Sequence, residues 1–171
     1  MGIRPAKAFR DPDKVAWTRY SRKPRYNYVK VMPHADLHQF RMGTDSGKYD
    51  LTVNLVAKKA IIVRDNAIES ARQSANKVLE SAIGAPGYYF IVRTYPHHII
   101  RENKMIAGAG ADRLQKGMRR SFGRPSDRAA RIAVGSVVFT IRTSKANLES
   151  VKLAMERAKR KLSGIYKIEI E

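Results

Sequence analysis

The chain has 171 residues and no cysteine. This absence excludes disulfides, thiolate zinc sites and cysteine nucleophiles, and it fits a cytoplasmic protein. Long apolar runs are also missing. No stretch approaches the roughly 18 to 20 residues that span a bilayer, and no apolar segment follows the first residues as in a signal peptide. We therefore expect a protein that is neither secreted nor inserted into a membrane.

The sequence also contains few acidic side chains. The sequence holds 15 Asp and Glu against 34 Lys and Arg, which gives a formal net charge of +19 and a pI of about 10.5. Such an excess repels itself in a compact protein unless a polyanion neutralises it, so the composition indicates a polyanionic partner. The few acids are scattered along the chain instead of clustering as catalytic carboxylates do, and we expect no enzymatic activity.

Hydrophobic residues are sufficient for one core. They make up 43% of the chain, and a length of 171 residues suits a single domain that covers residues 1–171. Two basic segments stand apart from the core-forming sequence, an N-terminal extension at residues 1–30 and a loop at residues 102–130.

The extension at residues 1–30 interleaves cations with aromatic residues. Its only acids are Asp11 and Asp13, and Trp17 stands among three tyrosines. Cations neutralise phosphate and aromatic rings stack on unpaired bases, so we expect this extension to bind RNA. The alternative is an extension that packs its aromatic rings on its own domain and leaves its charges in water. The candidate RNA-binding residues are Arg4, Lys7, Arg10, Arg19, Arg22, Lys23 and Arg25.

The loop at residues 102–130 lies between two strand-like sequences. From Arg101 to Arg131 the chain carries nine cations, three acids and four glycines, which cannot build a core. Structureless connections longer than about 12 to 15 residues are uncommon in compact domains and are usually functional or disordered. Arginine pairs bidentately with phosphate, and glycine lets a backbone approach a nucleic-acid surface. The candidate RNA-binding residues here are Arg101, Lys104, Arg113, Lys116, Arg119, Arg120, Arg124 and Arg128.

The apolar pattern predicts one sheet and two helices. One helix is expected from Asn66, with Glu69 completing a capping box, and both helices have a single apolar stripe. This pattern predicts an α+β fold, a two-layer sandwich in which two helices cover a mostly antiparallel or mixed sheet and the other face of the sheet stays free for a partner. The second helix is expected at 146–162, and strands are expected at 37–42 and 50–57, with a turn at 43–47 between them, and at 88–93, 132–141 and 166–171.

Neither a metal nor a cofactor is expected. His97 and His98 are adjacent, but neighbouring side chains of an extended segment point to opposite faces, and no cysteine completes a site. The run at residues 107–112 resembles a phosphate-binding loop in composition, yet it lacks the spacing of either nucleotide-binding motif. We therefore expect no small-molecule substrate.

Several longer motifs resemble a known family. Arg4-Pro5-Ala6, the segment from Tyr95 to Arg101, the run from Asn103 to Arg119 and Phe122-Gly123-Arg124-Pro125 are similar to the archaeal and eukaryotic large-subunit ribosomal protein ten family. Its bacterial counterpart is large-subunit ribosomal protein sixteen. The similarity covers essentially the whole chain, and the absence of the C-terminal extension of eukaryotic members resembles an archaeal protein.

The resemblance implies a structural, non-enzymatic role in the cytoplasm. Family members bind large-subunit ribosomal RNA near the base of the central protuberance, beside neighbouring ribosomal proteins, and help organise the A-site and peptidyl transferase region. The resemblance further implies that the basic loop points toward tRNA in the A-site or P-site region. The matching tRNA-facing residues are Ala107, Gly108, Ala109, Gly110, Ala111, Asp112 and Arg113.

Two other functions are compatible with the sequence. One is an enzyme that acts on phosphorylated or RNA substrates with the basic loop as a mobile lid. Turnover that is lost in Asp112→Ala would favour it. The other is a basic protein that compacts DNA, and comparable affinity for any duplex DNA would favour that function.

Overall fold

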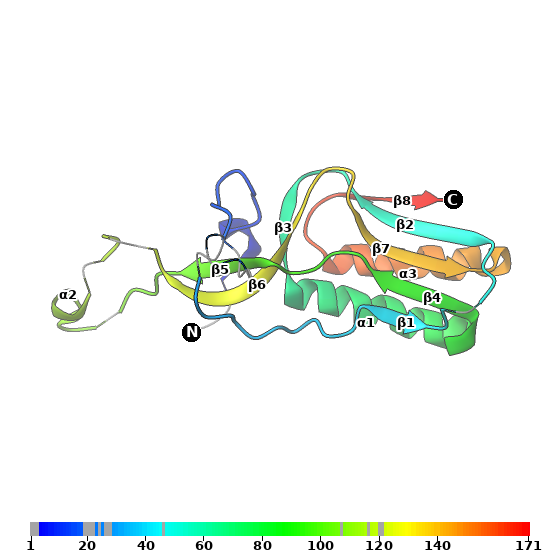
Figure 1. Cartoon of the computed structure of the whole chain (residues 1–171), viewed down its shortest axis with the longest axis horizontal. Helices are drawn as coiled ribbons and strands as arrows, with labels where there is room; N and C mark the ends of the chain where they lie inside the picture. The colour runs from blue at the N-terminus through cyan, green and yellow to red at the C-terminus, as the bar shows by residue number, and fades with distance from the viewer. Residues whose placement is uncertain are drawn as a thin grey trace.

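The computed structural model describes residues 4–18, 23, 25, 29–45, 47–106, 108–115, 117–119 and 122–171. In this part of the chain eight strands form two antiparallel sheets, and two long helices pack on the larger sheet. Figure 1 shows an elongated molecule with a body, made of the larger sheet and the helices, from which the smaller sheet projects. The α+β fold expected from the sequence is confirmed.

The larger sheet has five described strands in the order β1-β4-β7-β2-β8, and all neighbours pair antiparallel. Phe90 lies opposite Ile141, and Ile141 lies opposite Val53, so these three side chains point to one face. The bounds are β1 Arg41–Gly43, β4 Tyr88–Val92, β7 Val137–Thr143, β2 Leu51–Ala57 and β8 Tyr166–Ile170.

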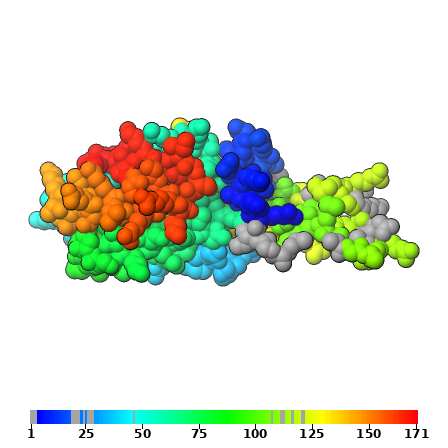
Figure 2. All heavy atoms as spheres, turned by 180° about the vertical axis from the view of Figure 1, so that it is seen from behind, coloured from blue at the N-terminus to red at the C-terminus, as the bar shows by residue number. Residues whose placement is uncertain are grey.

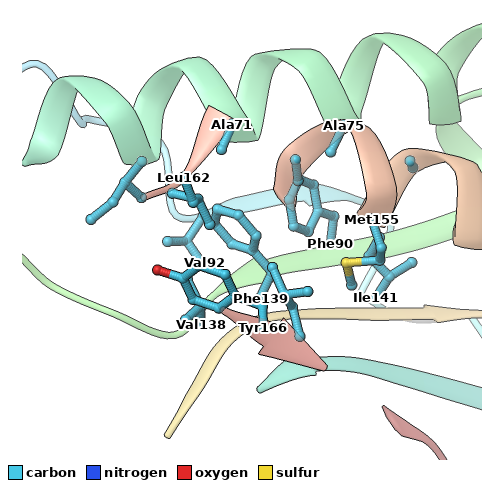
Figure 3. Close-up of a cluster of buried hydrophobic side chains, with 14 of the residues drawn as sticks. Ala71, Ala75, Phe90, Val92, Val138, Phe139, Ile141, Met155, Leu162 and Tyr166 are labelled. Carbon is cyan, nitrogen blue, oxygen red and sulfur yellow. The ribbon is translucent and has the colours of Figure 1, made fainter. Parts of the chain in front are cut away.

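Two helices, α1 (Asp65–Ala82) and α3 (Leu148–Lys161), lie side by side on that face of the sheet (Figure 1). Ala71 and Ala75 of α1 and Met155 of α3 are fully buried. The small alanine side chains let α1 lie close to the aromatic rings of the sheet, as Figure 3 shows. The main core therefore lies between one helix layer and one sheet layer.

The start of α1 differs from the sequence prediction. The N-cap residue is Arg64, in an extended conformation, and Glu69 pairs with a residue of the next turn instead of reaching back. The carboxylate of Asp65 accepts the backbone N–H groups of Asn66 (2.8 Å) and Asp36 (3.0 Å). Burial raises the pKa of Asp65 above its usual value despite these two hydrogen bonds. The predicted capping box between Asn66 and Glu69 is therefore wrong.

Strand β1 is shorter than the strand predicted at 37–42, and it pairs with β4 instead of β2. Gly43 has a φ of 81°, and a Cβ atom at this position would collide with the carbonyl oxygen of Tyr88. The N–H of Thr44 donates to the same oxygen at 3.0 Å. The predicted turn at 43–47 therefore does not join two adjacent strands, because β4 and β7 lie between β1 and β2.

A turn at residues 133–136 divides the strand predicted at 132–141. Gly135 has a φ of 78°, and the N–H of Ser136 donates to the carbonyl oxygen of Ala133 at 3.2 Å. This turn carries the chain from the smaller sheet into β7 of the larger one. The second predicted helix also starts later than expected, because a 3-10 turn, Lys145–Asn147, precedes α3.

The smaller sheet consists, in the described part of the chain, of β3 (Ile61–Arg64), β6 (Arg124–Ile132) and β5 (His98–Glu102), in that order. Strand β6 pairs with β3 near its C-terminal end and with β5 along the rest of its length. The same strand therefore ties the projection to the body. Two short 3-10 helices, Ala6–Ala8 and Ala85–Gly87, complete the elements near the N-terminus and after α1.

An N-terminal strap, residues 10–18, crosses this smaller sheet. At the β3 edge the N–H of Ile62 donates to the carbonyl oxygen of Arg10, and at the β5 edge the N–H of Ile99 donates to that of Thr18, both at 2.8 Å. Figure 2 shows the N-terminal segment, in blue, where the projection leaves the body. The strap therefore satisfies backbone groups at both edges of the sheet.

A second, small core lies under the strap. Phe9 is only 6% exposed and packs with Ile62, Ile100 and Ala129. The guanidinium carbon of Arg64 lies 4.4 Å from the centroid of the Phe9 ring. Phe9 therefore packs on the protein's own domain, whereas Trp17 is 48% exposed and the three tyrosines of the extension lie outside the described residues, so RNA binding by the extension stays a prediction. None of the described helices is long and apolar enough to cross a membrane.

Candidate nucleic-acid interface

Beyond the paired ends of β5 and β6 the chain forms an arm, residues 103–123, which extends away from the body (Figure 1). Glu102 and Arg124 are the last paired residues before it. One helical turn, α2 (Ala111–Leu114), lies within the arm. The loop predicted at 102–130 is shorter than expected, because residues 124–130 pair with strand partners in β6.

The base of the arm is closely packed. Gly123 has a φ of 75°, and a Cβ atom there would lie 2.8 Å from the carbonyl carbon of Glu102 and 2.9 Å from the backbone nitrogen of Asn103. Arg101 donates from Nη1 to the carbonyl oxygen of Phe122 at 2.7 Å, and its guanidinium carbon lies 3.7 Å from the centroid of the Phe122 ring. The base therefore needs glycine at position 123 for close approach and Arg101 as a clamp.

An ion pair joins the N-terminus to the same region. Arg4 Nε donates to Glu102 Oε1 at 2.6 Å, and this hydrogen bond lowers the pKa of the Glu102 carboxyl. The side chain of Arg4 stays 56% exposed, whereas that of Glu102 is 18% exposed. Glu102 therefore partly neutralises the charge of Arg4. The described cations farther along the arm have no such carboxylate partner.

Gln115 connects the two limbs of the arm. Its Nε2 donates to Asn103 Oδ1 at 3.2 Å and to the carbonyl oxygen of Lys104 at 3.1 Å, while its Oε1 accepts the N–H of Ile106 at 2.8 Å. Asn103 Nδ2 in turn donates to the carbonyl oxygen of Gly117 at 3.2 Å. These hydrogen bonds hold the proximal half of the arm together without a hydrophobic core.

Cations on the arm remain available to a partner. Lys104, Arg113 and Arg119 are exposed, and none of them forms an ion pair with a carboxylate that the structure describes. Gly108 and Gly110 have positive φ angles and no heavy atom within 4 Å of where a Cβ would stand. Large apolar side chains of the arm are also more than half exposed, namely Met105, Ile106, Leu114, Met118 and Phe122.

A groove of about 920 Å³ runs along the base of the arm. Arg4, Lys104 and Arg124 supply positive charge to its walls, and Glu102 and Asp127 supply negative charge. Phe122, Ile106 and Leu114 add apolar surface. This combination of cations with exposed apolar side chains suits a nucleic-acid backbone with bases beside it.

Two arginines of β6 point into the protein instead. Arg131 donates from Nη1 to the carbonyl oxygen of Val15 and from Nη2 to that of Pro12, at 2.9 and 2.8 Å. Arg128 donates from Nε to the carbonyl oxygen of Pro33 at 2.8 Å. Arg131 therefore fixes the strap, a role that the sequence analysis missed, and Arg128 is bound to its own chain through one of its nitrogens.

His98 is the buried member of the histidine pair. It is 1% exposed, and its Nδ1 accepts the N–H of Thr18 at 3.2 Å. Burial, helped by Arg131 and Arg101, lowers the pKa of His98 from 6.5 to about 4. The imidazole is therefore neutral at neutral pH and joins the strap to β5. Among the described residues no group of three or more His, Asp or Glu side chains is placed to hold a metal ion.

The predicted RNA-binding residues lie in three places. Lys7 is exposed ahead of the strap, Arg10 is exposed at its first position, and Lys23 and Arg25 are exposed farther along the extension. Arg101 and Arg4 lie at the base of the arm, and their contacts with RNA stay a prediction, as do those of the arm cations. Arg19, Arg22, Ala107, Lys116, Arg120 and the side chains of Ala111 and Asp112 lie outside the described part of the structure.

The fold and the interface define a class of protein, a small α+β body that presents a basic arm. A family model described as ribosomal protein L16p/L10e matches residues 14–169. The chain therefore belongs to the L16p/L10e family of ribosomal proteins, in agreement with the resemblance of its motifs. Proteins of this family are structural constituents, so the interpretation as an enzyme with a mobile lid is wrong.

Individual relatives support the same assignment. The chain is 43% identical over 164 residues to the large ribosomal subunit protein uL16 of Staphylothermus marinus, covering 95% of this chain and 90% of that protein. It is 39% identical over 168 residues to the uL16 protein of Methanococcus maripaludis, covering 98% and 94%. For the uL16 protein of Thermofilum pendens the identity is 38% over 171 residues, covering 100% and 98%. These relatives are archaeal, as the sequence predicted for this chain.

Proposed function

We propose that this protein is a structural constituent of the large ribosomal subunit in the cytoplasm. It binds large-subunit ribosomal RNA near the base of the central protuberance and contacts neighbouring ribosomal proteins. Its arm helps to organise the A-site and peptidyl transferase region and to position tRNA. The family membership and the names of the relatives support the ribosomal role.

The observation that carries the RNA interface is the charge of the arm. Lys104, Arg113 and Arg119 are exposed without a described carboxylate partner, on a segment that extends from the body (Figure 1). Uncompensated cations on one segment repel one another, and phosphate oxygens relieve this repulsion while forming charge-assisted hydrogen bonds. The open surroundings of Gly108 and Gly110 let the backbone approach a nucleic-acid surface directly.

The two halves of the arm have different tasks in this proposal. The base, with Arg101, Phe122 and Gly123, and the hydrogen bonds of Gln115 set the direction of the arm. The distal residues 107–113 then face tRNA, while the flanking cations contact ribosomal RNA. Positioning of this kind needs a packed base and an exposed tip, and it is supported by the close packing at Gly123 and by the exposure of residues 108–110.

Deletion of the tip tests the proposal. Replacing residues 107–113 with two glycines removes the tRNA-facing residues and leaves Gln115 in place. We expect the variant to fold with the melting temperature of the wild type and to enter large subunits in cells that lack the wild-type protein. Translation by those ribosomes should fall at least severalfold. Wild-type translation rates with the shortened arm would contradict the tRNA-positioning role, and failure to enter the subunit would show that the tip serves assembly instead.

Salt dependence tests the RNA interface separately. Each neutralised phosphate contributes a slope of roughly −0.7 to −0.9 to the logarithm of the binding constant against the logarithm of salt concentration. We expect the wild-type protein to bind purified large-subunit ribosomal RNA with a steep negative slope and to prefer it over duplex DNA of equal length at equal salt. Equal affinity for duplex DNA would favour the DNA-compacting alternative.

A further inference from the structure

The face of the larger sheet opposite the helices carries a cluster of one charge sign. Val53, Phe90 and Ile141 point to the helices, so their strand neighbours point to the other face. In the described part of the chain both long helices lie on the first face (Figure 1), and none lies on the second. We call this second face the open sheet face.

Three arginines lie on adjacent strands of the open sheet face. Arg41 of β1 lies opposite Ile91 of β4, and Arg142 of β7 lies opposite Tyr89 of β4. Arg93 directly follows β4, and its N–H donates to the carbonyl oxygen of Val138 in β7 at 2.9 Å. All three arginines are exposed. Strands lie about 4.8 Å apart and alternate residues of one strand about 6.6 Å apart, so the three arginines are spread over one patch of this face that is roughly 14 Å across.

A polar network positions one of these arginines. Arg93 Nε donates to Thr140 Oγ1 at 3.2 Å, and this hydroxyl donates to Asn54 Oδ1 at 2.8 Å. Thr140 is 2% exposed and Asn54 is 9% exposed, although no described helix covers them. The network engages only Nε of Arg93, so the two terminal nitrogens, the fork that recognises phosphate, have no described partner.

The charge of this face is not balanced within the chain. Strands β1, β4 and β7 contain no acidic residue. Glu169 of β8 shares the face through its pairing with Asn54, but it lies 3.3 Å from Lys167, which already neutralises it. Uncompensated charges of one sign on a single face repel one another. An external polyanion would relieve this repulsion.

We propose that the open sheet face is a second binding surface for the phosphate backbone of ribosomal RNA, remote from the arm and centred on Arg41, Arg93 and Arg142. This inference rests on the proposed ribosomal function, which supplies the polyanion. Arginine forks pair with carboxylate as well as with phosphate, so RNA is favoured over an acidic protein surface by the proposed ribosomal function and not by the type of cation.

The position of the open sheet face gives it a mechanical task. Figure 1 places the larger sheet and the arm toward opposite ends of the long axis of the molecule. An attachment at the base of the arm alone would let the body turn about that point. When one surface is bound to the RNA particle, the other surface is held near its own binding site at a high effective concentration. Two attachments therefore fix the orientation of the body, and with it the direction of the arm.

The test compares three triple variants of the full chain, each lacking three positive charges. The sheet variant is Arg41→Gln, Arg93→Gln and Arg142→Gln, and the arm variant is Lys104→Gln, Arg113→Gln and Arg119→Gln. The control is Lys152→Gln, Arg157→Gln and Arg160→Gln on the exposed side of α3. Binding to purified archaeal large-subunit ribosomal RNA is measured by filter retention from 50 to 400 mM KCl.

We expect the sheet variant to bind at least tenfold more weakly than wild type at 150 mM KCl. Its salt slope should become shallower by roughly 2.1 to 2.7, as expected for three lost phosphate contacts. The α3 control should stay within twofold of wild type. Sheet and control variants that lose affinity equally would show an unspecific charge effect and would overturn the inference.

The arm variant separates this inference from the proposed function. Weak binding by the arm variant together with wild-type binding by the sheet variant would overturn the second surface only. Wild-type binding by both would overturn the proposed RNA interface as well. If Arg93→Gln lowers the melting temperature, the double variant Arg41→Gln and Arg142→Gln replaces the triple sheet variant in the binding measurement, because it leaves the Thr140 network intact. Its salt slope should become shallower by roughly 1.4 to 1.8, and an unchanged slope would overturn the inference.

Discussion

The guanidinium carbon of Arg131 lies 4.9 Å from the centroid of the Trp17 ring. The same guanidinium donates to the carbonyl oxygens of Pro12 and Val15, so one side chain of β6 holds the strap at these two residues and at its aromatic residue. Trp17 also lies edge-on to His98, with 6.4 Å between the ring centroids. The strap, β6 and β5 therefore meet at a single cluster.

Replacing Arg131 with glutamine should release the strap. Hydrogen bonds from charged donors contribute about 1.5 to 3 kcal/mol each to stability. Water replaces part of the lost bonding in the variant, so we expect its free energy of unfolding to fall by roughly 2 to 4 kcal/mol. The strap should also become a site of rapid proteolysis. Chemical denaturation and limited proteolysis measure the two effects. Arg124→Gln, on the exposed part of the same strand, is the matched control and should change neither.

The contrast between Arg131 and Arg113 shows where sequence reasoning stops. Both are arginines in one basic stretch, but only Arg113 was predicted to bind RNA, and no role was predicted for Arg131. In the structure Arg131 is half-buried on backbone carbonyls, whereas Arg113 is exposed on the arm. The partners of Arg131 lie more than a hundred positions away in the sequence, so no local pattern could reveal them.

Local patterns succeeded where the contacts are themselves local. The alternation in β2 and the apolar stripe of α3 follow from periods of 2 and 3.6 residues, and both elements were predicted within a few residues. The pairing of β1 with β4 was not predictable, because it depends on Gly43 meeting the carbonyl of Tyr88 across the sheet. Likewise, the N-terminal part of β6 was predicted to be a loop. It contains Arg124, Asp127 and Arg128 and few apolar residues, so no apolar-polar alternation indicates a strand.

The pH dependence of stability should report the burial of His98. Its pKa is lowered from 6.5 to about 4, so the unfolded chain takes up a proton that the folded chain does not bind between these values. Stability from this residue is therefore fully present above about pH 6.5 and is lost as the pH falls toward 4, by up to roughly 3 kcal/mol. Urea unfolding at pH 4.5 and pH 7 measures the loss.

His98→Gln is the comparison for this titration. Its amide oxygen can accept the Thr18 N–H in place of Nδ1, but the side chain does not titrate. The difference in stability between the two pH values should be smaller in the variant than in the wild type. An identical difference would show that His98 protonates as freely in the folded protein as in the unfolded chain.

Gly123→Ala should destabilise the base of the arm. The new Cβ would meet the backbone of Glu102 at 2.8 Å, and a φ of 75° is strained for alanine as well. We expect the free energy of unfolding to fall by about 1 to 3 kcal/mol and the melting temperature to fall with it. Gly110→Ala is the matched control, because its φ of 77° is similar but the space around it is open. If both variants lose the same stability, the close approach at the base has no energetic importance.

Gln115→Leu should loosen the proximal arm without affecting the body. The substitution keeps the size of the side chain but removes the acceptor of the Ile106 N–H and the donor to Asn103. Hydrogen exchange of the Ile106 amide should accelerate by about tenfold, as expected from the loss of roughly 1 to 1.5 kcal/mol. Leu114→Ala, whose side chain is 76% exposed, should leave that exchange rate unchanged. Unchanged exchange in Gln115→Leu would mean that the limbs are not joined by this residue.

Photo-crosslinking from the arm, at the residue that follows its tip, tests the central claim most directly. A photoreactive phenylalanine analogue at the exposed position of Leu114 is incorporated into large subunits, which are then loaded with small subunits, messenger RNA and tRNA. We predict crosslinks to ribosomal RNA in all particles and to tRNA only when tRNA is bound. Crosslinks to ribosomal proteins alone, with none to either RNA, would contradict the account.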